Sequence, residues 1–203
     1  MARPRTPLLD RTRIAAAALR LVDDHGTLTI PALAAALGVR PSALYHHVDG
    51  RAGIIALLRE DLCTSIAEGD YWDQPWEPAL TAWAHSYRDA FAAHPGLVSL
   101  LATAPLTEPF LHVMYDRAVA VLRDAGFAEK ATLSVITALE SFVLGSALDL
   151  VAPSVMIDLV DQTATPHLAG ALAALPSRPA RADQAFELGL RAQLAGYRTL
   201  LAP

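Results

Sequence analysis

The segment 29–48, TIPALAAALGVRPSALYHHV, constrains the fold of this chain more than any other feature. Pro31 falls in the first turn of a short helix predicted over 30–37, and Pro41 opens a second helix after a turn at Gly38. A proline costs little in the first helical turn, where the backbone N–H has no intrahelical partner, and a glycine supplies the positive φ of a tight turn. This spacing predicts two short helices joined by a turn, the helix-turn-helix arrangement.

The apolar residues of this segment predict a small shared core. Ala34 is expected where the two helices cross, because a larger side chain there would push them apart. A preceding helix, beginning near Asp10 and ending at Gly26, is expected to close the core with Leu21 and Val22. The core residues expected from the segment itself are Leu33, Leu37, Val39 and Leu44.

The rest of the chain indicates an all-α protein, since it is rich in Ala and Leu and places Pro and Gly between segments. We expect an N-terminal three-helix helix-turn-helix domain over 1–50, a long connecting fourth helix over 51–68 and a C-terminal helical domain over 70–203. The third helix is expected to end near Val48. The helices expected after it span residues 51–67, 77–93, 97–102, 107–125, 129–151, 155–174 and 181–201.

Charge is distributed unevenly along the chain. The net charge is −5, but residues 1–60 hold eight Arg against five acidic residues, whereas residues 61–203 hold twice as many acidic as basic residues. Such asymmetry hints at a nucleic-acid-binding segment joined to another domain. The chain has no uninterrupted apolar run of about 18 residues and no apolar signal core, so we expect a cytoplasmic protein without membrane association. Its one cysteine, Cys63, excludes an internal disulfide and a cysteine metal cluster.

The second helix of a helix-turn-helix enters the major groove and meets base edges with its N-terminal residues. The outward residues expected to contact DNA there are Arg40, Ser42, Ala43, Tyr45, His46 and His47. Arg51 and Thr29, each at a helix start, are expected at phosphates, and Arg3 and Arg5 form an arm toward the DNA backbone or minor groove. Packing for Tyr45 and plain surface roles for the two histidines stay open as alternatives. A metal site on the adjacent histidines is not expected, because neighbours on a helix point about 100° apart.

The run LGVRPSALYHHV, followed by a turn and a long helix, resembles the DNA-binding domain of the tetracycline-repressor (TetR) family over residues 8–60. The patterns Trp83-Ala-His-Ser-Tyr-Arg, Ala93-His-Pro-Gly and Phe142-Val-Leu-Gly resemble the C-terminal domain of its tetracycline-repressor branch. The resemblance implies a homodimeric repressor that leaves a palindromic operator when a small molecule enters the C-terminal domain. Pro41 and Ser42 depart from the long polar readers often found there, which affects the operator sequence but not the docking mode.

Helical stripes in the C-terminal domain predict a mostly apolar effector cavity with a few polar anchors. The residues expected to line it are Trp83, Tyr87, Phe91, Leu101, Phe110, Met114, Thr137, Glu140, Ser141 and Leu144, with Phe142 and His112 as further candidates. Each of them can also be a plain core residue. The resemblance implies a histidine ligand to a drug-bound metal near residues 100–103, but this stretch is apolar. We therefore expect an apolar effector, with no metal and no cofactor.

The helices near 129–151 and 181–201 are expected to form the homodimer as a four-helix bundle, and Gly189 and Gly196 would allow close helix approach. Two-fold symmetry then requires half-sites about 34–36 Å apart, or a multiple. An enzyme is not expected, because the chain lacks a Gly-rich phosphate loop, a His-Glu-x-x-His motif and a Gly-x-Ser-x-Gly elbow. The alternative is a ligand-independent DNA-binding dimer whose C-terminal domain only dimerises or binds a protein partner.

Overall fold

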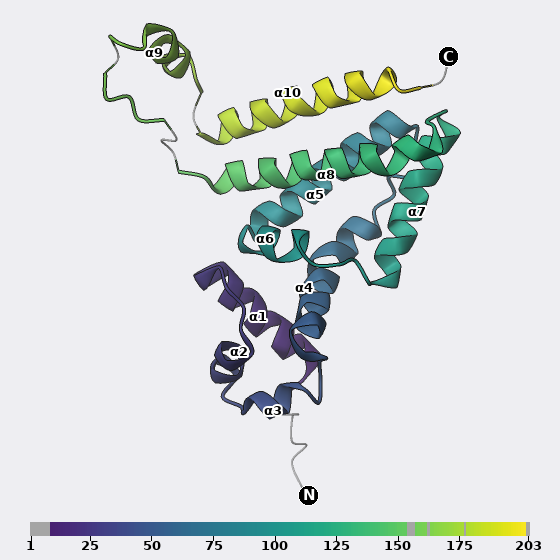
Figure 1. The fold of residues 1–203 in the computed structure, drawn as a ribbon, viewed down its shortest axis with the longest axis vertical. Coiled ribbons are helices and arrows are strands. Elements are labelled where there is room, and N and C mark those ends of the chain that lie inside the picture. Colours follow the sequence, from purple (N-terminus) through teal and green to yellow (C-terminus); the bar gives the residue numbers. More distant parts are fainter. Residues whose placement is uncertain (1–8, 154–156, 162, 177, 202–203) are drawn as a thin grey trace, which may run out of the picture.

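The computed structural model describes residues 9–153, 157–161, 163–176 and 178–201 (Figure 1). Within these ranges the chain forms ten helices and no β-strand; Phe127 and Leu201 form an isolated β-bridge. The all-α prediction is confirmed. The helices are α1 (Arg11–His25), α2 (Ile30–Leu37), α3 (Pro41–Leu44), α4 (Gly50–Ala67), α5 (Trp76–Ala93), α6 (Gly96–Ala102), α7 (Pro109–Asp124), α8 (Glu129–Val151), α9 (Pro166–Ala173) and α10 (Arg178–Arg198).

Local capping explains where the first two helices begin and end. The Asp10 carboxylate accepts the Arg13 N–H at 2.8 Å, and the Thr29 hydroxyl accepts the Ala32 N–H at 3.3 Å. Gly38 ends α2 at φ +68°, a left-handed conformation that favours glycine. Its N–H bonds to the Ala35 carbonyl and that of Val39 to the Ala34 carbonyl, the pair of bonds that defines a Schellman motif.

The core beneath these helices has the composition that the sequence predicts. Ala34 is 2% exposed where α2 begins its final turn, and Val22, Leu33 and Leu44 are fully buried. The remaining predicted members, Leu21, Leu37 and Val39, pack against this core and are half-buried.

The third helix is shorter than predicted. The α-helix ends at Leu44, and residues 45–47 form a turn in which the N–H groups of His47 and Val48 both bond to the Leu44 carbonyl. Buried Val48 is thereby drawn into the core directly before α4 begins. The predicted extension of the helix to residue 48 is therefore wrong, although the polar residues of the turn stay on the surface.

The α4 helix connects the two ends of the molecule (Figure 1). It packs against α1 at one end and against α5, α6 and α7 at the other. In Figure 1 the short α3 lies at one extremity, while α8 and α10 run side by side near the opposite one. The α4 helix therefore contacts other helices at both ends of the molecule.

The α8 helix lies between α5 and α10. Arg88 of α5 joins all three, because its guanidinium bonds to Ser146 of α8 at 2.9 Å and to Asp183 of α10 at 2.8 Å. The Phe142 ring stacks on Phe186 with 5.6 Å between centroids, at a position where a Cβ on Gly189 would stand 2.5 Å from the Phe142 ring. Gly189 therefore serves packing within the chain.

The predicted helix over 155–174 is wrong in its first half. Residues 157–161 form no helix, residues 154–156 and 162 lie outside the described part of the chain, and α9 begins only at Pro166. The Asp161 carboxylate accepts the N–H groups of Thr163 and Ala164, which holds a turn instead of a helix. Thr165 also precedes a proline, which disfavours helical backbone at that residue.

Apolar length alone does not make α8 a membrane span. It is the single helix in the described ranges that is long and apolar enough to cross a bilayer. The inner face of α8 carries Val135, Leu139 and Val143, which are buried against neighbouring helices. Its outer face still exposes Leu133, Leu148 and Val151, and Leu188 of α10 is 64% exposed. These four apolar side chains are therefore exposed on α8 and α10 in the single chain.

The α1 helix also touches the larger half directly, through α6. His94, just before α6, lies 2.9 Å from the Asp23 carboxylate through Nδ1. A Cβ on Gly96 would stand 2.7 Å from the Val22 carbonyl oxygen, so only glycine permits this approach. The start of α6 and the end of α1 are therefore in close contact.

Candidate functional site

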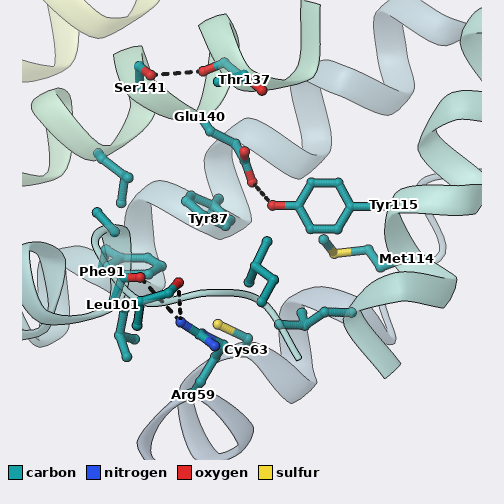
Figure 2. Close-up of a pocket in the computed structure, with 15 residues that line it drawn as sticks. Arg59, Cys63, Tyr87, Phe91, Leu101, Met114, Tyr115, Thr137, Glu140 and Ser141 are labelled. Carbon is teal, nitrogen blue, oxygen red and sulfur yellow. Dashed lines mark hydrogen bonds between the residues drawn. The ribbon is translucent and has the colours of Figure 1, made fainter. Parts of the chain in front are cut away.

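A cavity of about 240 Å³ lies among α4, α5, α6, α7 and α8 (Figure 2). Helical spacing places its walls, since residues three or four apart share a face. On α5 these are Tyr87 and Phe91, and on α7 they are Leu111, Met114 and Tyr115. The complete lining is Arg59, Cys63, Tyr87, Phe91, Leu101, Ala102, Ala104, Leu106, Leu111, Met114, Tyr115, Thr137, Glu140, Ser141 and Leu144.

Most of the residues expected around an effector lie on this one cavity. They are Tyr87, Phe91, Leu101, Met114, Thr137, Glu140, Ser141 and Leu144. Four helices supply them, so the fold brings together positions that are up to 57 residues apart in the chain. The wall is mainly apolar, and a carboxylate, hydroxyls and a guanidinium interrupt it.

Four candidates lie off the cavity. Trp83 is 1% exposed and packs against Trp72 and Tyr87, so it supports the wall from behind. Phe110 is half-buried beside the wall residue Leu111 but turned about 100° from it on α7. Phe142 faces α10, as its stacking shows, and His112 is exposed with Nε2 3.2 Å from the Leu106 carbonyl.

Glu140 and Tyr115 form the polar contact of the cavity. The Tyr115 hydroxyl donates to Glu140 Oε1, and Figure 2 shows the two side chains pointing toward each other from α7 and α8. Burial raises the pKa of Glu140 above its ordinary value, and the hydrogen bond from Tyr115 only partly offsets this. Burial and the nearby Glu140 carboxyl raise the pKa values of Tyr87 and Tyr115, so both keep their protons.

Cys63 contributes a small apolar surface. Burial, the largest cause, raises the pKa of its thiol to about 12, against a lowering by Arg59. The thiol is 5% exposed and protonated at neutral pH, which removes the nucleophilic character that a thiolate would have.

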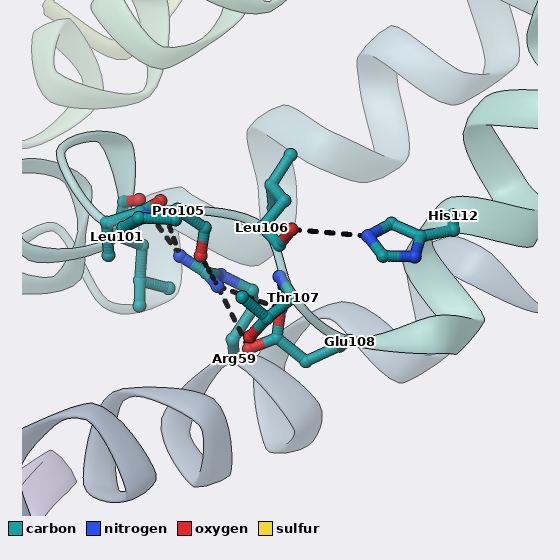
Figure 3. A network of polar contacts seen from close by, with 8 residues as sticks. Arg59, Leu101, Pro105, Leu106, Thr107, Glu108 and His112 are labelled. Atoms are coloured by element: carbon teal, nitrogen blue, oxygen red, sulfur yellow. Dashed lines mark hydrogen bonds and ion pairs between the residues drawn. The ribbon is translucent and has the colours of Figure 1, made fainter.

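Arg59 fixes one wall of the cavity to α4 (Figure 3). Its Nη1 donates to the Glu108 carboxylate at 2.8 and 2.9 Å and to the Pro105 carbonyl at 2.8 Å, and Nη2 donates to the Ala104 carbonyl at 3.0 Å. A longer bond of 3.3 Å reaches the Leu101 carbonyl at the end of α6. The side chains of Arg59 and Glu108 are both buried, with 3% and 9% of their surface exposed. We call this cluster of Arg59, Glu108 and the carbonyls bound by Arg59 the clamp, because it holds the α6–α7 connection against α4.

The pKa of Glu108 is lowered despite its burial. Burial alone would raise it, but hydrogen bonds from Arg59 and from the Thr107 N–H outweigh that effect. A carboxyl whose pKa falls on folding stabilises the native state above its unfolded pKa and loses that contribution as the pH falls through the folded value. The clamp should therefore weaken only in acid, below the ordinary glutamate value of 4.5.

The residues expected to meet DNA lie at the starts of α2 and α4, on α3 and in the turn after it, and Figure 1 shows α3 at the end of the molecule opposite α8 and α10. Thr29, Arg40, Ser42, Tyr45, His46 and Arg51 are exposed, whereas Ala43 and His47 are half-buried. Tyr45 is 59% exposed, so little of its ring is used in packing. Arg40 occupies the N-cap position of α3, and its backbone is extended, as expected for a residue before a proline. Arg51 lies in the first turn of α4. Arg3 and Arg5 lie outside the described residues.

Sequence reasoning missed several wall residues, chief among them Arg59, Cys63 and Tyr115. Arg59 and Cys63 are four apart on α4, which the sequence marks only as a connecting helix. The available signal was that Arg59 lies four residues after Ile55, so that both side chains project from the same face of the helix. Tyr115 adjoins the predicted Met114, and its partner Glu140 lies 25 residues away.

We predict that Arg59→Met lowers the free energy of unfolding by about 3–5 kcal/mol, because it leaves Glu108 buried without its counter-charge. Urea denaturation measures the change. Arg117→Met, at an exposed position on α7, is the matched control and should change stability by less than about 0.5 kcal/mol. The double variant Arg59→Met/Glu108→Leu should recover much of the loss. If Arg59→Met lowers the free energy of unfolding no more than Arg117→Met does, the clamp does not contribute to stability as proposed.

The larger half of the chain matches a known family. Residues 70–201 match the family described as "Tetracyclin repressor-like, C-terminal domain". The HTH-type transcriptional repressor DrrR1 of Streptomyces coeruleorubidus is 26% identical over 144 residues, which are 70% of this chain. The chain spans only 53% of that relative's length.

Solved structures agree with this match over nearly the whole chain. A possible TetR family transcriptional regulator from Streptomyces coelicolor A3(2) is 27% identical with a TM-score of 0.76, covering 94% of this chain and 99% of that one. ActR from Streptomyces coelicolor in complex with actinorhodin is 25% identical with a TM-score of 0.70, covering 94% of this chain and 96% of that one. The family match covers well over half of the sequence, so the chain belongs to the tetracycline-repressor-like family of transcriptional regulators.

Proposed function

We propose that this protein is a homodimeric transcriptional repressor that binds a palindromic operator through α3 and is released by a small molecule in the cavity. The observation that carries the proposal is the cavity itself, because α4 and α6 form part of its wall and both also contact α1. A ligand that enlarges the cavity must move those helices, and with them the helix-turn-helix. In this proposal the DNA-binding domain spans residues 1–50, the connecting helix spans 51–68, and the effector-binding and dimerisation domain spans 70–203.

The cavity volume supports release by expansion. About 240 Å³ lies below the about 300–1,000 Å³ typical of sites for drug-sized ligands. A larger ligand therefore requires the wall to yield at the α6–α7 connection, which Arg59 ties to α4. The ligand would bind the expanded state better than the DNA-binding state, and its differential affinity would set the loss of operator affinity.

The exposed apolar side chains of α8 and α10 support the homodimer. A second copy would bury Leu133, Leu148 and Leu188 in a four-helix bundle, as the family resemblance implies. Two-fold symmetry about this bundle would present two α3 helices to the two halves of a palindrome. A cytoplasmic location follows from this role.

The ligand-bound relative supports effector response. ActR has been crystallised with actinorhodin, and its structure covers nearly the whole of this chain. The alternative function, a ligand-independent DNA-binding dimer, would leave the cavity without a role.

We predict that the double variant Arg40→Ala/Tyr45→Ala binds the operator about 30-fold or more weakly than the wild type, since each lost contact is worth about 1–3 kcal/mol. A mobility-shift assay with DNA flanking the protein's own gene measures this. Arg117→Ala, which removes an exposed arginine from α7, is the control and should bind as the wild type does. Equal binding by the double variant would show that α3 is not the reading helix.

We predict that an apolar compound found by thermal-shift screening raises the melting temperature and releases the operator. Ala104→Phe, which places a ring at the cavity wall, should abolish both effects. The same substitution at exposed Ala120, on the outer face of α7, should preserve them. If no compound shifts the melting of the wild type, the ligand-independent function is correct instead.

A further inference from the structure

Glu140 is the acidic side chain of the cavity wall, and no basic side chain pairs with it in the described part of the chain. Its hydrogen-bond partner is the Tyr115 hydroxyl, which donates to Oε1. The second carboxyl oxygen has no protein donor among the described residues. A carboxylate held among apolar groups is costly unless a counter-charge or further donors accompany it.

Arg59 cannot supply that counter-charge, although it lines the same cavity. Its two terminal nitrogens already donate to Glu108 and to the carbonyls of Leu101, Ala104 and Pro105. The Arg59–Glu108 pair is neutral as a unit. In Figure 2 Arg59 also lies across the cavity from Glu140, with Tyr87 between them. The carboxyl of Glu140 therefore faces a space in which the protein provides no available cation.

The rest of the wall suits a flat apolar body. The rings of Tyr87 and Phe91 lie side by side, with centroids 4.9 Å apart and planes tilted by 30°. Leu101, Met114 and Leu144 complete an apolar lining. Aromatic faces attract organic cations as well as apolar rings. The cavity therefore has one acidic group without a counter-charge, in a wall that is mainly aromatic and aliphatic.

We propose that the effector is an amphiphilic amine, an apolar ring system that carries one protonated nitrogen, and that Glu140 is its counter-ion while Tyr115 positions the carboxylate. The inference rests on the proposed function, since it names the ligand class of the same cavity. It also sharpens the sequence-based expectation of a purely apolar effector, because a neutral hydrocarbon would offer the Glu140 carboxyl neither a positive charge nor a hydrogen-bond donor.

A proton linkage accompanies this pairing. Burial raises the pKa of Glu140 in the free protein, so the carboxyl keeps its proton above the ordinary glutamate range. A bound ammonium favours the ionised form and lowers that pKa, so the proton passes to solvent as the amine binds. Amine binding should therefore release protons over the pH range between the two values.

The test uses two probes of the same shape, 2-(naphthalen-1-yl)ethylamine and 2-(naphthalen-1-yl)ethanol, titrated into the full chain by calorimetry. The wild type should bind the amine about tenfold to a hundredfold more tightly than the alcohol, as expected for a charge-assisted bond. Titrations in buffers of different ionisation enthalpy should show proton release with the amine alone. Glu140→Gln should remove both the preference and the proton release, and Tyr115→Phe should reduce the preference.

Glu129→Gln is the matched control, because it removes the same charge from the same helix at a carboxylate that is 83% exposed. It should keep the preference. Equal affinity of the wild type for both probes, no amine binding, or an unchanged preference in Glu140→Gln would each overturn the inference. If a neutral compound still releases the operator in those cases, the proposed function stands. Amine binding without operator release would support the ligand class and overturn the proposed function.

Discussion

The buried ion pair between Arg59 and Glu108 determines how the two ends of this molecule are connected. It forms where the middle of α4 meets the connection from α6 to α7, and the Arg59 guanidinium also collects carbonyls from that connection. Burying two charges is expensive, and the cost is offset only where geometry and additional hydrogen bonds are good. Here both conditions hold, so the chain segment that closes the cavity is attached to the helix that reaches α1.

The two sites of the proposed function lie apart in the structure. The exposed residues of α3 and of the turn after it lie at one extremity, and the cavity lies among α4 to α8. The two are linked by α4 and by the close approach of α6 to α1, where Gly96 meets the Val22 carbonyl and His94 meets Asp23. The proposed release of DNA needs no further moving part, since cavity expansion acts on helices that already touch the helix-turn-helix.

Local signals made the helix-turn-helix predictable. Two prolines, a glycine at positive φ and four apolar positions act within twenty residues, and the structure places each as expected. The predictions of where α3 ends and where α9 begins were wrong. Both boundaries depend on competing hydrogen bonds, at Leu44 and at Asp161, that hydrophobic periodicity does not report. About half of the cavity wall was predicted, since helical stripes identify inward faces. Arg59 was missed because its burial depends on Glu108, 49 residues away.

In the proposed function, the cavity and the DNA-reading helix α3 share one conformational equilibrium. Linkage requires that an effector which weakens operator binding must itself be bound more weakly by the operator complex, by the same factor. Calorimetric titration of an active compound into the free protein and into its operator complex measures that factor directly. We predict a lower affinity in the complex, matching the loss of operator affinity caused by the compound. Equal affinity for the free and the DNA-bound protein would show that the two sites are independent.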